Sequence, residues 1–245
     1  MSATSPAPIV STAELHRQYG EGEAAVHALR GVTIAFPAGE FTAIMGPSGS
    51  GKSTLMHLLA GLDRPTSGSV VVDGQELANL DDKRLTALRR DKLGFVFQAF
   101  NLIPVLSARE NITLPPMLAG TEVDDAWFDT LNDAVGLGDR LTHRPAELSG
   151  GQQQRVAIAR ALISRPAVVF ADEPTGNLDS KSASEVLELL RRAVDEFGQT
   201  VIMVTHDPGA AAAADRVVML RDGGVVHDGA SDSAEGLLDL MKQVA

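Results

Sequence analysis

Phe41-Thr-Ala-Ile-Met45, followed by Gly46-Pro-Ser-Gly-Ser-Gly51-Lys52-Ser53, is the stretch of sequence that decides the fold. The first five residues predict a short buried strand, and residues 52–60 predict a helix that ends near Gly61. A G-x4-G-K-S loop between a strand and a helix is typical of a phosphate-binding loop. Its glycines let backbone N–H groups turn inward, and the helix N-terminus adds about half a positive charge that faces the phosphates. The stretch therefore predicts a nucleotide-binding α/β protein.

Individual side chains of this loop have expected roles. Lys52 should reach the β- and γ-phosphates, Ser53 should ligate Mg²⁺, and Thr54 should donate a hydrogen bond to a phosphate oxygen. The alternative is a glycine-rich turn that caps an ordinary helix, which the strand and helix on either side disfavour. The expected ATP-binding residues of the loop are Gly46, Pro47, Ser48, Gly49, Ser50, Gly51, Lys52, Ser53 and Thr54.

A second motif, Val168-Val-Phe-Ala-Asp172-Glu173, ends an apolar run with two acids. Such a run predicts a strand buried on both faces, with the acids at its carboxyl end, where open α/β sheets carry their sites. We expect Asp172 to hold Mg²⁺ and Glu173 to polarise the attacking water. Taken alone, two solvated acids at a strand end would be the simpler interpretation, but the phosphate loop favours catalysis.

A third motif, Leu148-Ser149-Gly150-Gly151-Gln152, lies just before a helix expected over residues 152–162. The serine is a good helix cap, and the N–H groups at the helix start form a second anion-binding end. No other residues around this motif supply a nucleotide pocket. Capping and anion binding use the same geometry, so the two interpretations do not compete.

The order of the elements predicts an α/β fold with a parallel sheet, because strands at 168–171 and 201–205 flank a helix at 182–197. Residues 9–45 read as β structure. Helices at 122–135 and 152–162 form a helical insertion, in which Pro104, Pro115 and Pro116 break the early part. We expect one domain over 1–245: a nucleotide-binding core with an antiparallel β subdomain (9–98 and 163–230), a helical subdomain (99–162) and a mobile tail (1–8).

The three motifs in this order resemble the ATP-binding subunits of ABC transporters. The resemblance implies a P-loop ATPase domain in which Leu148–Gln152 caps the ATP held by a second copy of the chain. It also implies that Gln98 contacts Mg²⁺ and the attacking water, and that His206 contacts the γ-phosphate. The remaining roles that it implies are a dimer contact at Asp179 and stacking on adenine at Tyr19, the only tyrosine.

Longer matches indicate the branch of the family: Ser149–Leu162, Thr175–Ser180 and Phe97–Ile103 look like the macrolide-exporter, lipoprotein-release and antimicrobial-peptide-resistance group. The resemblance implies a separate integral membrane subunit as partner and a peripheral location on the cytoplasmic side of the membrane. Phe100 or Leu102 is expected to border the groove that receives this subunit. A cell-division-type regulatory ATPase, acting on a membrane partner without transport, remains the alternative. The sequence names neither the transported substrate nor its direction.

The composition sets limits on other functions. The net charge of −11 argues against a nucleic-acid-binding surface spread over the whole chain. With no cysteine, disulfides, thiol catalysis and Cys-ligated metals are excluded. The histidines outside the Thr205-His206-Asp207 motif form no metal-like spacing. No apolar run approaches the roughly 18–20 residues that cross a bilayer, and the N-terminus lacks the character of a secretory signal.

Overall fold

The computed structural model describes residues 8–244, so most of the tail expected at 1–8 lies outside the described residues. No helix in that range is both long and apolar enough to cross a membrane. The strands are β1 Val10–Tyr19, β2 Val26–Phe36, β3 Phe41–Met45, β4 Ser67–Val72, β5 Gln75–Glu76, β6 Leu93–Phe97, β7 Val168–Asp172, β8 Val201–Val204, β9 Arg216–Arg221 and β10 Gly224–Ala230. The helices are α1 Lys52–Leu59, α2 Asp82–Lys92, α3 Ala108–Ala119, α4 Asp125–Val135, α5 Gly150–Leu162, α6 Ser180–Asp195, α7 Pro208–Ala211 and α8 Ala234–Val244, with short 3₁₀ turns between them.

Two sheets organise the described chain. The larger has the order β10-β9-β3-β8-β7-β6 and is parallel except for its β9–β10 edge, as the strand–helix alternation predicts. The smaller sheet, with the order β2-β1-β4-β5, is antiparallel. The expected α/β class, with an N-terminal antiparallel sheet and an inserted set of helices, is confirmed.

Side chains of the central strands alternate between two hydrophobic cores. Ala43 and Met45 of β3 join the core beneath α3–α6, whereas Ile44 joins the core between the two sheets and α1. β7 behaves in the same way, because Val169 and Ala171 face the first core and Phe170 the second. This alternation explains why the strands read as unbroken apolar runs: both faces of the sheet are covered.

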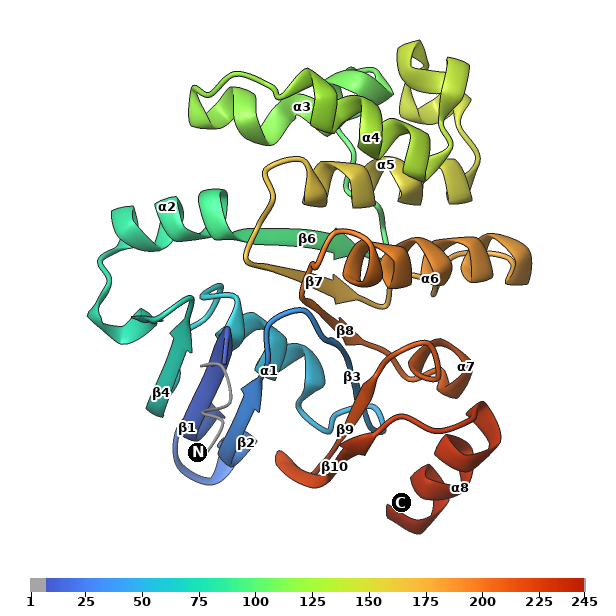
Figure 1. The fold of residues 1–245 in the computed structure, drawn as a ribbon. Coiled ribbons are helices and arrows are strands. Elements are labelled where there is room, and N and C mark those ends of the chain that lie inside the picture. Colours follow the sequence, from blue (N-terminus) through green and yellow to red (C-terminus); the bar gives the residue numbers. More distant parts are fainter. Residues whose placement is uncertain (1–7, 245) are drawn as a thin grey trace, which may run out of the picture.

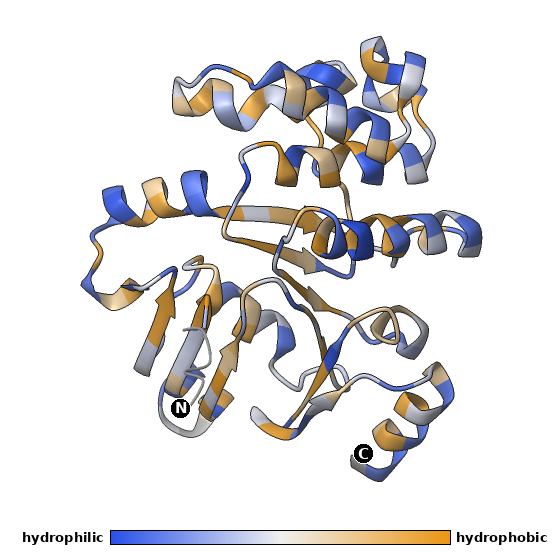
Figure 2. Ribbon diagram, viewed as in Figure 1, coloured by the Kyte–Doolittle hydropathy of each residue, from blue (hydrophilic) through white to orange (hydrophobic). Residues whose placement is uncertain are grey.

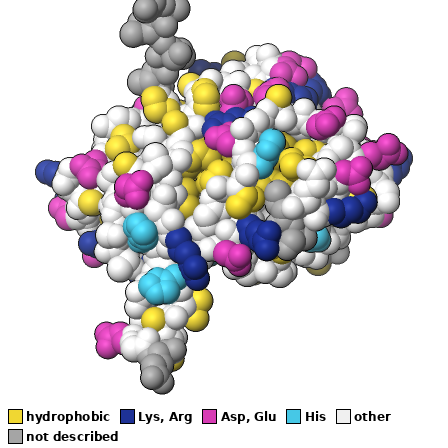
Figure 3. Space-filling model, turned by 90° about the horizontal axis from the view of Figure 1, so that it is seen from below, with side chains coloured by type: hydrophobic (Ala, Val, Ile, Leu, Met, Phe, Trp, Pro, Cys, Tyr) yellow, Lys and Arg dark blue, Asp and Glu magenta, His cyan; other side chains and the backbone are white. Residues whose placement is uncertain are grey.

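The helices α3, α4 and α5 stack at one end of the molecule, and the small antiparallel sheet lies at the other end (Figure 1). Hydrophobic residues concentrate in the strands, while the outer faces of the helices are mostly hydrophilic (Figure 2). On the face seen from below, acidic and basic side chains are interspersed around a central group of hydrophobic ones (Figure 3). The boundaries drawn for the subdomains at residues 99 and 162 stay a prediction.

One expectation about the insertion is wrong. Pro115 and Pro116 do not break the chain, because α3 runs through both prolines from Ala108 to Ala119. Ser107 and Glu110 form a capping box that starts this helix, and buried Ile112 and Pro116 are packed on its inner side. Packing against α5 therefore outweighs the lost N–H donors. The sequence pattern also does not predict the helices α2, α7 and α8.

Candidate nucleotide-binding and catalytic site

The phosphate loop connects the buried end of β3 to α1. Gly51 precedes α1 with φ 103° and no side chain caps the helix, so the first N–H groups of α1 remain available as donors. A Cβ atom on Gly46 would lie 2.1 Å from the Leu220 carbonyl oxygen, and one on Gly51 would lie 2.5 Å from that of Ala28. Only glycine fits at these two positions, because the backbone of the loop packs directly against neighbouring backbone carbonyl groups.

Two side chains of the loop are placed for binding an anion. The Lys52 ammonium donates to the carbonyl oxygens of Gly46 and Pro47, at 2.8 and 2.9 Å. Burial lowers the pKa of Lys52, while Glu173 and Asp172 oppose this shift. The Ser50 hydroxyl is buried and has no hydrogen-bond partner among the described residues. A buried, unpaired donor beside uncapped N–H groups fits a phosphate oxygen.

The carboxyl ends of three parallel strands meet beside this loop. Phe97 of β6, Asp172 of β7 and Val204 of β8 lie in register across the sheet. The next residues along each strand therefore reach the same edge. These are Gln98, Glu173 and Thr205, with His206 one position further.

Glu173 is held in an unusual conformation. Its φ is 45°, in the left-handed region that few non-glycine residues occupy, and its N–H donates to Val204 at 2.9 Å. The Glu173 carboxylate lies 2.7 Å from Nδ1 of His206 and accepts a 3.4 Å hydrogen bond from Thr205. The imidazole is 71% exposed, whereas the Glu173 side chain is only 19% exposed. The His206 ring therefore reaches out to solvent while Glu173 stays inside.

Asp172 carries the electrostatic cost of the site. Burial raises the pKa of its carboxyl, and Glu173 raises it further. His57 and Lys52 oppose the increase. Because burial outweighs these two positive neighbours, the poorly solvated carboxylate would be stabilised by a cation at this position.

Gln98 is turned toward Asn177. The amide nitrogen of Gln98 donates to Oδ1 of Asn177 at 3.1 Å, and the Asn177 amide donates to the Gln98 carbonyl at 3.0 Å. The Gln98 amide oxygen is then the atom left for a metal. Oxygen ligands from Ser53, Gln98 and Asp172 are those that Mg²⁺ prefers, so the donor set fits this ion. The expected metal roles of these three residues stay predictions.

Tyr19 lies at the end of β1, in the small sheet. Its hydroxyl donates to Asp63 at 2.8 Å, and the Arg17 guanidinium lies 4.4 Å from the ring centroid. Arg17 also pairs with Asp63 at 2.9 Å. Tyr19 is 40% exposed and is tied to the segment that follows α1, so stacking on a base is sterically possible.

The third motif forms the N-terminus of α5, as expected. Ser149 accepts from the Gln152 N–H at 3.2 Å, and Gln152 accepts from the Ser149 N–H at 2.9 Å, which makes a capping box. Leu148 is buried, whereas Ser149 is exposed. Asp179 caps α6 through Lys181 and Ser182, and hydrogen bonding from Ser182 lowers the pKa of its carboxyl. Both motifs thus start helices, and their roles between two copies stay predictions.

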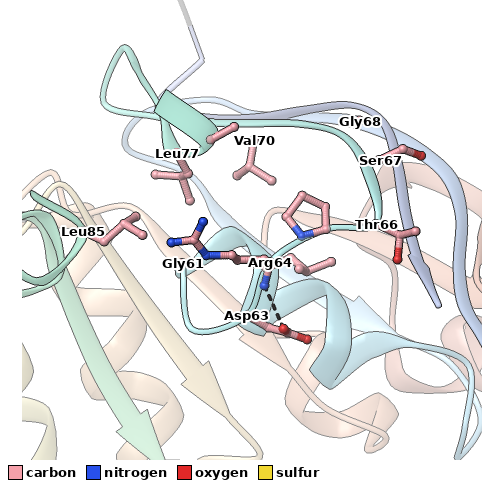
Figure 4. A pocket seen from close by; sticks show the side chains of 12 residues that line it. Gly61, Asp63, Arg64, Thr66, Ser67, Gly68, Val70, Leu77 and Leu85 are labelled. Carbon is pink, nitrogen blue, oxygen red and sulfur yellow. Dashed lines mark hydrogen bonds between the residues drawn. The ribbon is translucent and has the colours of Figure 1, made fainter. Parts of the chain in front are cut away.

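Of the hollows that lie outside this site within residues 8–244, two adjoin residues with expected roles. One, of about 240 Å³, is lined by Asp63, Arg64, Leu77 and Leu85 among others, and contains no residue of the phosphate loop or the acid pair (Figure 4). The other is a groove of about 410 Å³ between β6 and α3, lined by residues that include Phe95, Phe97, Leu114 and Leu118. It lies next to the strand end that carries Gln98.

The structure reassigns the apolar segment after Gln98. Leu102 packs against the larger core, and a Cβ atom on Gly150 would lie 3.6 Å from the ring of Phe100. Both side chains therefore make internal contacts. Their expected contact with a membrane partner stays a prediction, for which the exposed Leu118 of α3 offers a more accessible groove position.

Three residues near the site were missed from the sequence: Asn177, Gln154 and Arg160. The sequence marks Asn177 only as part of the Thr175–Ser180 match, although its side chain is hydrogen-bonded to Gln98. Gln154 is fully buried and lies three residues after Gly151 and four before Ile158, both of which are also buried. This helical spacing was a signal that Gln154 belongs to the inner face of α5.

The comparisons with known proteins agree with this geometry. Residues 29–176 match the family described as ABC transporter. The chain is 50% identical over 226 residues to the macrolide export ATP-binding/permease protein MacB of Marinobacter nauticus, covering 91% of this chain but only 35% of that protein. It is 49% identical to an uncharacterized ABC transporter ATP-binding protein of Thermotoga maritima, covering 88% of this chain and 92% of that one.

Solved structures show the same fold. The ATP-binding cassette MJ0796, in a dimeric post-hydrolysis state bound to ADP and Pi, superposes with a TM-score of 0.81 at 42% identity, over 91% of this chain and 99% of that chain. CbiO1 of Clostridium perfringens, part of the ABC transporter complex cbiONQ, superposes with a TM-score of 0.83 at 29% identity, over 97% and 94% of the two chains.

Fold and site together define a P-loop ATPase with an inserted set of helices. Within that class, the chain belongs to the ABC transporter family, as an ATP-binding cassette. It spans about a third of the length of the MacB proteins that it matches, and nearly all of the Thermotoga relative.

Proposed function

We propose that the chain is the ATP-hydrolysing motor of an ABC transporter of the exporter type, which dimerises head to tail around two Mg-ATP and drives an integral membrane permease. The observation that carries this proposal is the convergence of Lys52, Asp172, Glu173 and His206 at one sheet edge. A phosphate loop and two acids at that edge are what ATP hydrolysis needs.

Each residue has a definite task in the proposed reaction. The N–H groups of Gly46–Thr54 and the Lys52 ammonium bind the phosphates, with Tyr19 against the base. Ser53, Asp172 and Gln98 would hold Mg²⁺, which would neutralise negative charge at the phosphates. Glu173 accepts the hydrogen bond of the attacking water and orients it, and His206 contacts the γ-phosphate from beside Glu173.

The Ser149 end of α5 acts on the second copy of the chain. Its N–H groups and hydroxyl would meet the γ-phosphate that the partner's phosphate loop holds, and Asp179 lies at the same interface. The dimeric state of MJ0796, 42% identical, supports this arrangement. Nothing in the sequence of α5 supplies a second lysine or acid pair, so the end needs a partner to become a nucleotide site.

The groove between β6 and α3 is the proposed docking site for a cytoplasmic helix of the permease, which would place the chain at the cytoplasmic side of the membrane. Leu118 is 72% exposed and lines the groove, and an apolar groove suits an amphipathic helix. The MacB relatives are named for macrolide export, which supports export as the direction of transport.

Copurification tests this function with a matched pair of variants on α3. Leu118→Glu places a charge in the groove, whereas Met117→Glu places the same charge on an exposed neighbour that does not line it. We expect the first variant to lose the membrane subunit and the second to keep it, with basal ATPase unchanged in both. Retention by both variants would show that the partner docks elsewhere, and absent ATPase in the wild-type chain would contradict the motor function itself.

A further inference from the structure

Two side chains of α5, Gln154 and Arg160, donate hydrogen bonds to the backbone on either side of Gln98. Upstream of Gln98, the Gln154 amide nitrogen donates to the Phe97 carbonyl at 3.3 Å. Downstream, the Arg160 guanidinium donates to the carbonyls of Phe100 at 2.9 Å and Asn101 at 2.7 Å. The helix whose N-terminus is Ser149 is therefore bonded to backbone on either side of Gln98.

Gln154 also reaches the second catalytic strand end. The same amide nitrogen donates to the Pro174 carbonyl at 2.5 Å, directly after Glu173 in the chain. Gln154 is fully buried, and its amide oxygen has no partner among the described residues. An unpaired buried amide oxygen lowers the stability of the fold. The two hydrogen bonds that the Gln154 nitrogen donates are therefore the contacts that offset this loss.

The segment held by Arg160 is strained. Phe100 and Asn101 have φ values of 60° and 50°, and within residues 8–244 they are the only adjacent non-glycine residues with positive φ. No carboxylate in that range forms an ion pair with Arg160, and burial lowers the pKa of its guanidinium. A largely desolvated cation that bonds only to backbone carbonyls stabilises one particular conformation of this segment.

The first residue of α5, Gly150, also packs against the segment after Gln98. A Cβ atom on Gly150 would lie 3.5 Å from the side chain of Leu178 and 3.6 Å from the ring of Phe100. Thus the first residue of α5 abuts the segment after Gln98 and the segment that leads to Asp179. A shift of α5 on meeting a partner's nucleotide would be passed directly to Gln98 and Glu173.

We propose that Gln154 and Arg160 are positioning residues that lock the Ser149 helix to the backbone beside Gln98 and Glu173, so that engagement in trans sets the catalytic geometry in cis. This inference rests on the proposed function and deepens it. Because neither side chain touches the phosphate loop, the two residues act on turnover and leave nucleotide binding alone. Displacement of a catalytic group by about 1 Å costs on the order of 100-fold in rate.

The test measures kcat, KM and monomer affinity for Mg-ATP in Gln154→Leu and Arg160→Lys. We expect kcat to fall roughly 10- to 100-fold in Gln154→Leu and less in Arg160→Lys, with monomer affinity within about twofold of wild type. Gln199→Leu is the matched control, because Gln199 is also a buried amide that donates to a backbone carbonyl, that of Pro166 at 2.9 Å, away from the site. It should lower Tm comparably but spare kcat.

A double-mutant cycle separates positioning from general destabilisation. If Gln154 acts through Gln98, then Gln98→Ala combined with Gln154→Leu should lose little more rate than the slower single variant. Full multiplication of the two losses, or kcat near wild type in both positioning variants, would overturn the inference while leaving the ATPase function standing. If Gln154→Leu does not fold, the Arg160→Lys result alone decides. A wild-type chain without ATPase would instead contradict the proposed function, and the inference with it.

Discussion

The helices α1 and α5 both start at a Ser-Gly sequence, but their N-termini are capped differently. At α1, Gly51 offers no side-chain cap, and Lys52, Ser50 and two acids surround the uncapped N–H groups. At α5, Ser149 and Gln152 cap the helix reciprocally and Ser149 is exposed. The first end is prepared to hold an anion within one chain, whereas the second is stable by itself and presents its dipole outward.

The difference teaches why one chain carries one and a half sites. The α1 end keeps polar groups without partners, which costs stability and marks a place where a ligand repays that cost. The N-terminus of α5 is capped by its own side chains and has no such cost, so it is ordered before a partner chain binds. The following predictions test this division of labour, beginning with the largest expected effect.

Glu173→Gln should lower ATP turnover by roughly 100-fold or more, the scale expected for loss of a positioned proton acceptor. Mg-ATP binding should remain nearly intact, and an ATP-bound dimer should accumulate because the product state is not reached. Phosphate release and size-exclusion chromatography with ATP measure the two effects. Glu196→Gln, a surface acid paired with Arg192, is the control and should behave like wild type. Near-normal phosphate release in Glu173→Gln would remove this residue from its assigned role.

Ser149→Arg should abolish ATP-driven dimerisation without weakening the binding of ATP to the monomer. The arginine would occupy the space of the partner's γ-phosphate, while the α1 end of the same chain stays untouched. Ser107→Arg gives the matched control, because Ser107 caps α3 through the same kind of capping box with Glu110. Light scattering and equilibrium binding distinguish the two outcomes. A collapse of monomer affinity in Ser149→Arg alone would show that this end acts in cis.

Much of this division could be predicted from the sequence, because it is written in contiguous motifs. The strand, loop and helix at 41–60 and the two acids at the end of β7 follow from local pattern, and the register of parallel strands brings them together. The ties between distant segments could not be predicted, since Gln98 to Asn177 and Arg160 to Phe100 depend on side-chain placement after packing. The prolines of α3 failed as a signal for the same reason, because tertiary packing outweighed propensity.

A substitution at Asp172 tests whether the site at the N-terminus of α1 lowers the stability of the fold, as the N-terminus of α5 does not. Burial, reinforced by Glu173, raises the pKa of Asp172, so the folded chain binds a proton where the unfolded chain has lost it. Stability then falls as pH rises from the ordinary aspartate range through the folded pKa, and at pH 7 the ionised Asp172 destabilises the fold. Asp172→Asn should therefore raise Tm at pH 7 in the absence of nucleotide, by on the order of a few °C for a chain of this size.

Asp179, beside the α5 end, should show the opposite sign. Hydrogen bonding from Ser182 lowers the pKa of Asp179, so its stabilising contribution is present above the unfolded pKa and is lost as pH falls. Asp179→Asn should lower Tm slightly at pH 7, since asparagine still caps a helix. Thermal melts of both variants at pH 7 and near pH 4 measure the contrast, which should shrink at the lower pH. An Asp172→Asn variant that melts below wild type at pH 7 would show that Lys52 and His57 already compensate the buried acid, and that the α1 end carries no stored cost.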